Sequence, residues 1–195
     1  LNNKSDTVSI NKWYDLKLNL KEAVKSKEEY YVLFKDAVEL RMRSDVPVGV
    51  CLSGGLDSSS ILSTLLKDKS HSEINTFSAV YNKGDTGDES EFINLYKAQV
   101  KNMHFTTPDA SALFNDLKNF VKAHGEPIAS TSAYAQYRVM KLAKGKVVVT
   151  LDGQGADEQL AGYHYFFGLY YKELLLNFRW LKLIQEIFTY YSKHK

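Results

Sequence analysis

Short continuous runs of apolar residues recur along the chain, separated by longer stretches with a helical period. A run of four to eight apolar residues bounded by turn residues is typical of a strand that is buried on both faces of a sheet. Such runs predict strands over residues 48–52, 74–81, 103–106 and 146–151. The clearest are the first, with the sequence VGVCL, and the last, which contains three consecutive valines.

Apolar residues in the intervening segments recur every three or four positions, which is the period of one helix face. Before the first strand, for example, Tyr31, Phe34, Val38 and Met42 follow this spacing. Strands that alternate with helices predict an α/β fold, in which a mostly parallel, twisted sheet is covered by helices on both faces as a three-layer arrangement. The helical patterns cover residues 27–44, 61–66, 88–100, 109–124 and 132–144.

The two ends of the chain differ in pattern from this central part. Residues 1–25 are mostly polar, and we predict that they form an arm or interdomain linker before a folded domain over residues 26–195. Because the first residue is leucine, we also expect a processed or excised piece of a longer protein. Residues 164–195 carry many aromatic side chains at helical spacing, which predicts a helical tail. Such residues usually form core, and the alternative is an exposed face that packs against further chain.

Composition restricts the class of protein. At 195 residues, with 44% apolar and 25% charged residues, the chain has the length and composition of one soluble globular domain. The net charge of +2, without a basic cluster, argues against nucleic acid as a partner. The single cysteine, Cys51, cannot form an internal disulfide, so we expect a reducing compartment. With no signal sequence and no apolar stretch of about 18 residues, we predict a cytoplasmic protein without a membrane segment.

Chemistry enters at residues 53–59, with the sequence SGGLDSS, which lie between the first predicted strand and a helical pattern. Two adjacent glycines allow a tight turn with bare N–H groups, and the following helix directs the positive end of its dipole at an anion. The loop therefore predicts a phosphate site. Lysine is absent between Val46 and Leu66, which excludes the common nucleotide-binding P-loop, and no G-x-G-x-x-G motif occurs. The remaining pattern, SGGxDS, resembles the PP-loop of ATP pyrophosphatases.

A second loop, DGQGADE at residues 152–158, follows the valine-rich strand. Its acidic residues suit Mg²⁺, which prefers oxygen ligands and could neutralise a departing pyrophosphate. The alternative is a helix N-terminus whose acidic residues complement the helix dipole. Ligands of open parallel sheets bind beyond the carboxyl ends of the strands, near a switch in strand order. We therefore expect the site at the strand ends marked by Ser53, Tyr81 and Asp152.

Three spaced motifs together resemble the synthetase domain of glutamine-dependent asparagine synthases. They are RSDVPVG at residues 43–49, SGGLDSS, and DGQGADEQLAGY at residues 152–163, and the similarity extends from about residue 27 to about residue 167. The resemblance implies a fold like that of the adenine nucleotide alpha hydrolases and PP-loop ATP pyrophosphatases. It also implies an ATP-dependent amide ligase, which adenylates the side-chain carboxylate of aspartate to β-aspartyl-AMP, releases pyrophosphate, and lets ammonia displace AMP to give asparagine.

The resemblance also implies roles for residues. Asp57 and Asp157 would contact Mg²⁺ and pyrophosphate, and with Glu158 they form the expected catalytic set. Cys51 as a nucleophile is disfavoured, because a cysteine in an apolar strand is usually an inert packed residue. The implied cofactors are ATP and Mg²⁺, and the implied partners are aspartate or a similar carboxylate, ammonia, a glutaminase domain in the full-length chain, and a second copy in a homodimer. The nucleotide-binding residues would be Cys51, Leu52, Ser53, Gly54, Gly55, Leu56, Asp57, Ser58, Ser59, Val80, Asp152 and Gly153.

The chain also departs from the family pattern. Several asparagine synthases carry SGEGSDE where this chain has DGQGADE, so Gln154 replaces a glutamate, and a neutral amide cannot take a proton as a carboxylate does. Either Glu158 or another carboxylate fills that role, or the acceptor differs. The N-terminal cysteine of the family's glutaminase half has no counterpart here, so we expect no glutamine hydrolysis by that mechanism. A later catalytic lysine is not placed either, and we predict a fragment that binds nucleotide weakly and turns over slowly or not at all. The alternatives are another adenylating PP-loop amidotransferase, an enzyme that modifies a nucleotide or tRNA base, and a non-catalytic nucleotide-binding module.

Overall fold

The computed structural model describes residues 10–15, 18, 24–68, 73–82, 85, 87–128 and 130–193. The chain divides into two compact units, residues 1–37 and residues 38–195. Helix α1 (Lys27–Arg41) begins in the first unit and ends in the second. All the strands that the structure describes lie in the second unit, and so do the motifs that predict chemistry.

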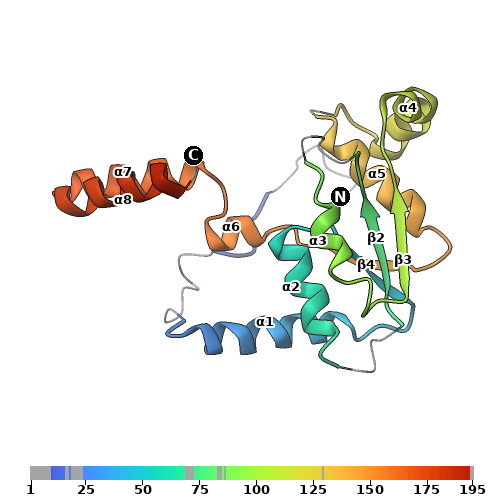
Figure 1. Cartoon of the computed structure of the whole chain (residues 1–195), viewed down its shortest axis with the longest axis horizontal. Helices are drawn as coiled ribbons and strands as arrows, with labels where there is room; N and C mark the ends of the chain where they lie inside the picture. Colours follow the sequence, from blue (N-terminus) through green and yellow to red (C-terminus); the bar gives the residue numbers. More distant parts are fainter. Residues whose placement is uncertain are drawn as a thin grey trace. The chain divides into compact units, whose positions relative to one another are not determined.

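The second unit is built on a four-stranded parallel sheet with the order β3-β2-β1-β4 (Figure 1). β1 lies between two partners, since Val50 is in register with Thr76 of β2 on one side and with Leu151 of β4 on the other. The parallel α/β sheet predicted from the alternation of patterns is therefore confirmed. The strands are β1 (Val48–Cys51), β2 (Asn75–Ala79), β3 (Asn102–Thr106) and β4 (Val149–Leu151).

The strand order contains one reversal. From β1 the chain adds β2 and then β3 in one direction, and it then returns to place β4 on the free side of β1. Loops that leave neighbouring strands in opposite directions open a crevice at the carboxyl ends of those strands. The crevice in this sheet therefore lies between the ends of β1 and β4, where the two predicted loops begin.

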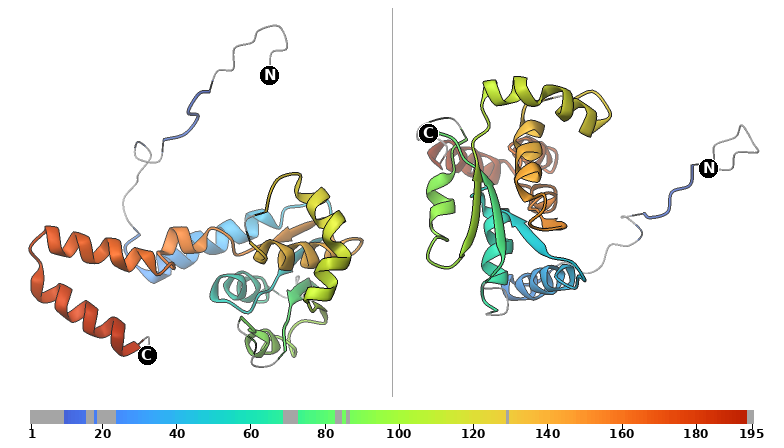
Figure 2. Two further views of the ribbon diagram at one scale, coloured as in Figure 1. Left: turned by 90° about the horizontal axis from the view of Figure 1, so that it is seen from above. Right: turned by 90° about the vertical axis from the view of Figure 1, so that its right-hand side faces the viewer.

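Helices cover both faces of the sheet. α5 packs on one face through Val139 and Ala143, which contact Cys51 and Phe77. Side chains alternate along a strand, so Val50 points to the opposite face, where α2 packs on β1 (Figure 2). The helices of this unit after α1 are α2 (Leu56–Leu65), α3 (Ser90–Asn94), α4 (Ala110–His124), α5 (Ser132–Ala143), α6 (Ala156–Leu160), α7 (Tyr165–Leu176) and α8 (Trp180–Lys193).

Several elements are shorter than their patterns predict, among them α1, predicted over residues 27–44, and β2, predicted over residues 74–81. The last strand was expected from residue 146 but begins at Val149, because the amides of Lys146 and Val147 turn back to the Ala143 carbonyl at the end of α5. The helical pattern over residues 88–100 gives α3 only to Asn94 and continues as turns. Just before its start, the Asp88 carboxylate accepts hydrogen bonds from the backbone N–H and the hydroxyl of Ser90, whereas the N-cap residue itself, Glu89, makes no side-chain cap bond.

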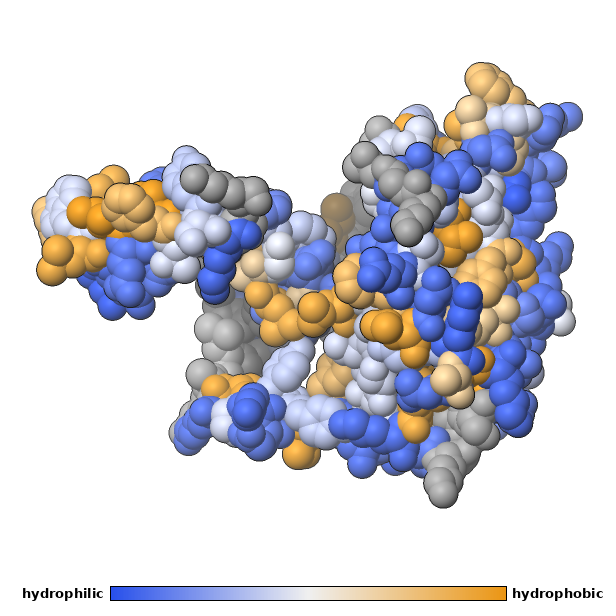
Figure 3. Space-filling model, in the orientation of Figure 1, coloured by the Kyte–Doolittle hydropathy of each residue, from blue (hydrophilic) through white to orange (hydrophobic). Residues whose placement is uncertain are grey.

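The aromatic tail forms two helices that contact each other, α7 and α8. The predicted helical tail is confirmed, and its aromatic residues are largely exposed rather than core: Leu174 is the buried residue of α7, and α8 has none. Much of the surface of α7 and α8 is therefore drawn in the hydrophobic colours of Figure 3. None of the helices that the structure describes is long and apolar enough to cross a membrane. The exposed apolar stripe of α8 comprises Trp180, Leu181, Ile184, Phe188 and Tyr191.

Candidate active site

The loop between β1 and α2, residues 53–59, owes its shape to glycine. Gly54 has a φ of +97°, in the left-handed region that favours glycine. A Cβ at Gly54 would lie 2.7 Å from both the Cβ and the backbone oxygen of Glu89, at the start of α3. Gly55 then caps α2 without a side chain. The first backbone N–H groups of α2 therefore have no side-chain acceptor from the cap residue, and such groups attract anions.

Serine hydroxyls hold this loop from within. The buried Ser58 Oγ lies 2.9 Å from Ser53 Oγ, accepts a hydrogen bond from the Ser53 N–H and donates to the Gly55 carbonyl at 3.2 Å. The Gly55 N–H in turn donates to Ser53 Oγ at 3.1 Å. These bonds engage both hydroxyls inside the loop. In this arrangement the serines fix the shape of the loop, and the backbone N–H groups at the start of α2 are the candidate donors to an anion.

The loop after β4 lies against this cradle. A Cβ at Gly153 would stand 2.9 Å from the Cβ of Asp57 and 2.9 Å from the backbone nitrogen of Ser58. Gly155 then turns the chain with a φ of +95° and caps α6. The pairing of β1 with β4 thus brings together two loops that are about one hundred residues apart in the sequence.

Carboxylates gather where the two loops meet. Partial burial raises the pKa of Asp57, and the nearby charges of Asp157 and Glu158 raise it further. Glu158 Oε1 accepts a hydrogen bond of 2.8 Å from the Tyr163 hydroxyl, and this bond is the main cause that raises the pKa of Tyr163 to about 12. Among the described residues, no three His, Cys, Asp or Glu side chains converge as a metal site.

A cavity of about 350 Å³ lies beside these loops, within the size range of small-molecule sites. Its walls come from the ends of β1, β2 and β4 and from α5. The expectation that the strand ends at Ser53, Tyr81 and Asp152 share one site agrees with this geometry, since all three line the cavity. The other predicted residues that line it are Cys51, Leu52, Gly55, Asp57, Ser58, Gly153 and Asp157.

Five predicted residues are not part of the cavity wall. Gly54 lies under Glu89 and shapes the turn, while the Leu56 side chain is 83% exposed. The Val80 N–H donates to the Thr106 carbonyl and so continues the pairing of β2 with β3. The remaining two are Ser59 and Glu158. Contacts of these residues with a nucleotide stay predictions.

The wall formed by β2 and α5 has no motif in the sequence. Phe77 and Ala79 of β2 and Ala135 and Val139 of α5 line the cavity, and they make this part of its wall apolar. Phe77 also packs with Val139 in the core. These residues follow an ordinary strand and helix pattern, so nothing local marks them as part of a site. One indirect signal is that the α5 segment precedes the last strand, so that it is expected to cover one face of the sheet beside the site.

The Asp152 carboxylate is held at the border of this apolar part. Gln136 of α5 donates a hydrogen bond from Nε2 to Asp152 Oδ1 at 3.2 Å, and the Thr150 hydroxyl donates to Oδ2 at 3.2 Å. Burial and the adjacent Asp152 charge raise the pKa of the Cys51 thiol to about 12. A thiol so hard to ionise is a poor nucleophile, in agreement with the expectation that Cys51 is a packed residue.

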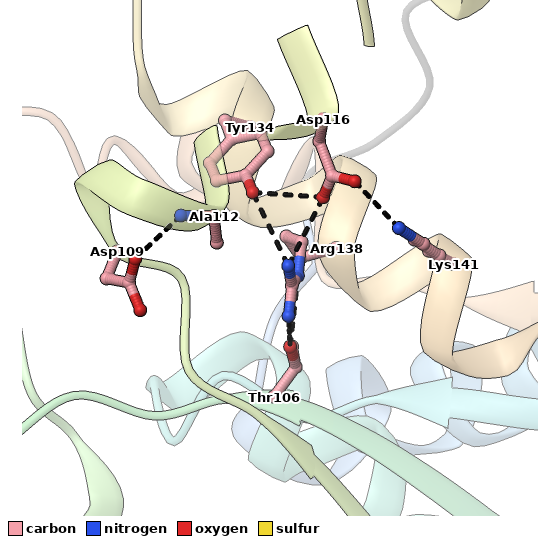
Figure 4. A network of polar contacts seen from close by, with 7 residues as sticks. All are labelled: Thr106, Asp109, Ala112, Asp116, Tyr134, Arg138 and Lys141. Atoms are coloured by element: carbon pink, nitrogen blue, oxygen red, sulfur yellow. Dashed lines mark hydrogen bonds and ion pairs between the residues drawn. The ribbon is translucent and has the colours of Figure 1, made fainter. Parts of the chain in front are cut away.

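A polar network at the α4–α5 interface fixes the position of α5 (Figure 4). The buried Asp116 carboxylate of α4 accepts hydrogen bonds from Lys141 Nζ at 2.7 Å, from the Tyr134 hydroxyl at 3.1 Å and from Arg138 Nη1 at 3.2 Å. Arg138 also donates to the hydroxyl of Thr106 at the end of β3. These bonds, led by that of Lys141, lower the pKa of Asp116. The network ties the helix that carries Gln136 to the carboxyl edge of the sheet.

Comparison with known proteins places this geometry in a family. The family model described as asparagine synthase matches residues 29–193. The chain belongs to the asparagine synthase family. The match extends through α7 and α8, beyond the stretch in which the motifs carried the resemblance. The α/β fold is therefore that of an asparagine synthase domain.

Curated relatives carry matching names. A Methanocaldococcus jannaschii protein, provisionally named glutamine-hydrolysing asparagine synthetase 2, is 36% identical over 140 residues, which cover 70% of this chain and 26% of that protein. Glutamine-hydrolysing asparagine synthetase 1 of Bacillus subtilis is 34% identical over 131 residues, 67% of this chain and 20% of the relative. Asparagine synthetase B of Escherichia coli is 31% identical over 170 residues, 79% and 30% respectively. The chain thus spans about a quarter of the length of the relatives it matches.

Proposed function

We propose that the cavity binds ATP, with the phosphates at the loop of residues 53–59 and the adenosine towards the apolar wall. The main support is the contact between the two loops after β1 and β4. This contact brings N–H donors and carboxylates together at the carboxyl ends of the strands. The N-terminus of α2 would attract the phosphates. Cys51 and Leu52 would line the pocket of adenine and ribose, with Asp152 and Gly153 beside the nucleotide. A nucleotide contact of Val80, which follows β2 outside the cavity wall, stays a prediction from the family resemblance.

Mg²⁺ would accompany ATP, held by Asp57 and Asp157. Mg²⁺ is usually bound through one or two carboxylates together with substrate phosphates, which fits two acidic side chains on facing loops. The raised pKa of Asp57 also fits, because a divalent cation would offset the repulsion from Asp157 and Glu158. When bound, the ion would neutralise the charge that grows on the departing pyrophosphate.

The proposed reaction is the activation of a carboxylate for amide formation. An oxygen of the aspartate side-chain carboxylate attacks the α-phosphorus of ATP, the bond between the α-phosphorus and the bridging oxygen breaks, and pyrophosphate leaves. Ammonia then attacks the carbonyl carbon of β-aspartyl-AMP, AMP leaves with the bonding electrons, and asparagine forms. Glu158 would accept the proton that the attacking nitrogen loses, and Tyr163, which hydrogen-bonds it, would hold it in place.

Gln154 supports a second candidate. It lines the cavity at the position where the family resemblance implies a glutamate. A different carboxylate acceptor, or nucleotide binding without catalysis, would suit this change. Ammonia supplied by a glutaminase domain in the full-length protein, and assembly as a homodimer, are further parts of the proposal.

ATP–pyrophosphate exchange separates these candidates. Exchange that depends on aspartate supports the asparagine synthase reaction, exchange with another acid supports a different acceptor, and ATP binding without exchange supports the non-catalytic module. Asp57→Asn should reduce the exchange rate by about a hundredfold or more, because it removes a charge from the proposed metal site. Asp36→Asn, on an exposed position of α1, is the matched control and should leave exchange unchanged. Exchange that survives Asp57→Asn would refute the Mg²⁺ assignment.

A further inference from the structure

Glu89 places a carboxylate beside the proposed phosphate site. The residue is the N-cap of α3, and a Cβ at Gly54 would lie 2.7 Å from both the Cβ and the backbone oxygen of Glu89. Glu89 Oε2 lies 3.6 Å from the position that a Cβ would have at Gly55, the N-cap residue of α2. Both Glu89 and Gly55 line the cavity. A negative charge therefore stands next to the helix N-terminus that is proposed to attract phosphates.

Hydrogen bonds on both sides hold the backbone of Glu89. Its carbonyl accepts a hydrogen bond from the Ile93 N–H at 3.2 Å, within the first turn of α3. On the other side, the Asp88 carboxylate accepts hydrogen bonds from the backbone N–H groups of Ser90 at 3.2 Å and Tyr81 at 3.4 Å. The Glu89 side chain itself makes no cap bond, and it takes part in none of the ion pairs among the described residues. Its charge is therefore held near the loop without a cation to offset it there.

The charge of the cavity wall has one sign. Of the described residues that line the cavity, four are acidic and none is lysine, arginine or histidine. The acidic residues are Asp57, Glu89, Asp152 and Asp157. Asp57 and Asp157 are the proposed metal ligands, and Asp152 accepts hydrogen bonds from two neutral donors. Glu89 is the one of the four that lies beside the glycine loop and has no part in the proposed reaction.

Such a wall distinguishes between two forms of a nucleotide. The phosphates of ATP without a cation are strongly negative, and a carboxylate beside them repels them, more strongly in a partly buried site than in open water. A divalent cation on the phosphates is the largest charge in the site, so it reverses the sign of this interaction. The difference depends on the charge of the carboxylate and not on its shape.

We propose that Glu89 makes the cavity selective for a nucleotide that carries a divalent cation, by repelling the phosphates of the same nucleotide without one. This inference rests on the proposed binding of ATP. The role differs from that of Asp57 and Asp157, which would hold the ion, whereas Glu89 excludes the nucleotide that lacks it. The site then avoids a bound nucleotide that is unable to react, because the charge of a departing pyrophosphate would not be neutralised.

The test measures the dissociation constant of ATP on the whole chain by equilibrium dialysis, once in excess Mg²⁺ and once in excess EDTA. The ratio of the EDTA value to the Mg²⁺ value expresses the selectivity. Glu89→Gln keeps the shape and removes the charge, so it should lower this ratio about tenfold, through tighter binding of metal-free ATP. Glu89→Asp retains the charge and should keep most of the ratio. Glu91→Gln, at an exposed position of α3 outside the cavity wall, is the control for loss of one charge and should keep the wild-type ratio.

Salt tests the same repulsion in the wild type without any substitution. In EDTA, the binding of ATP should become tighter as the NaCl concentration is raised, because salt screens the repulsion between like charges. Weaker binding at higher salt would contradict a repulsive wall. Circular dichroism spectra of all variants verify the fold.

The outcomes separate this inference from the proposed function. If the wild type binds ATP in neither buffer, the proposed function itself fails. If it binds ATP with Mg²⁺, and metal-free ATP binds Glu89→Gln no more tightly than the wild type, the proposed function stands and the role of Glu89 is overturned. Metal-free binding below detection in both proteins overturns it in the same way. A change confined to the Mg²⁺ value also overturns it, because Glu89 would then help to hold the ion.

Discussion

Gly153 and Asp57 are packed so closely that a Cβ on the glycine would lie 2.9 Å from the Cβ of the aspartate. One residue follows the last strand of the sheet, and the other lies at the start of α2, after the first strand. Their contact joins the two loops into one surface. A larger residue at position 153 therefore tests directly how tightly the two loops are packed.

Gly153→Ala should therefore disturb the site. The added methyl group meets backbone and Cβ atoms, which cannot move as a flexible side chain does, and overpacking of this kind costs about 1–3 kcal/mol. We expect a lower melting temperature and weaker ATP binding, measured by thermal denaturation and calorimetry. Gly168→Ala in α7 is the matched control, because a Cβ there meets no atom within 4 Å. Equal effects of the two substitutions would contradict the close packing of the loops.

Gly54→Ala combines backbone strain with a steric clash. The residue has a φ of +97°, and its Cβ would lie 2.7 Å from two atoms of Glu89. Gly145→Ala provides the comparison, since Gly145 has a φ of +80° with no atom within 4 Å. Backbone strain, which both variants share, costs about 1–2 kcal/mol. The clash with Glu89 is added in Gly54→Ala, so this variant should reduce the free energy of unfolding by more than Gly145→Ala does. Urea denaturation of both variants measures the difference, and a smaller loss for Gly54→Ala would contradict the clash.

Asp116 should make stability depend on acid pH. Its folded-state pKa is lowered, chiefly by the Lys141 hydrogen bond, so its contribution is present above the ordinary aspartate pKa of about 3.9 and is lost as the pH falls through the folded value. Wild type should exceed Asp116→Asn in melting temperature at pH 7, and the difference should shrink below about pH 4. Tyr134→Phe, which removes one neutral donor, should show little change of this kind with pH. A difference that is constant from pH 7 to pH 3 would contradict the charged network.

Cys51 should be unreactive in the folded protein. With a pKa of about 12, its thiol is almost entirely protonated at pH 8, and the thiolate is the reactive form. We expect alkylation by iodoacetamide to be at least about a hundredfold slower in the native chain than in denaturant. Since the sequence contains one cysteine, the readout has no other source. Cys51→Ala should also retain aspartate-dependent exchange, whereas loss of exchange with an intact fold would favour a chemical role for the thiol.

Much of the fold followed from periodicity, and the site followed in part. The runs at 48–52 and 146–151 predicted buried strands of a mostly parallel sheet, and SGGLDSS marked the loop that the structure places at a cavity. The pairing of β1 with β4, rather than of β3 with β4, is a property of the whole topology, which no local pattern encodes.

The remaining wall of the cavity depended on contacts between distant segments. Gln136 lies on a helix with an ordinary amphipathic pattern, and its hydrogen bond to Asp152 exists because α5 lies over the sheet edge. Ser58 is among the residues expected to bind the nucleotide, and it lines the cavity, while its hydroxyl donates to the Gly55 carbonyl within the loop. Sequence motifs show which loop carries the chemistry, whereas the direction of each hydroxyl depends on how the loop closes.

The pairing of β1 with β4 also bears on how the chain folds. Val50 and Leu151 are about one hundred residues apart, so closing the loop between them has a large entropy cost, and parallel pairing of this kind is slow. A nucleotide that touches both strand ends would act as a non-covalent cross-link between the first and last strands. The melting temperature should then rise with ATP concentration, because ATP would bind the native state and not the unfolded chain. The segments that bind the ligand would also be those that pair last as the chain folds.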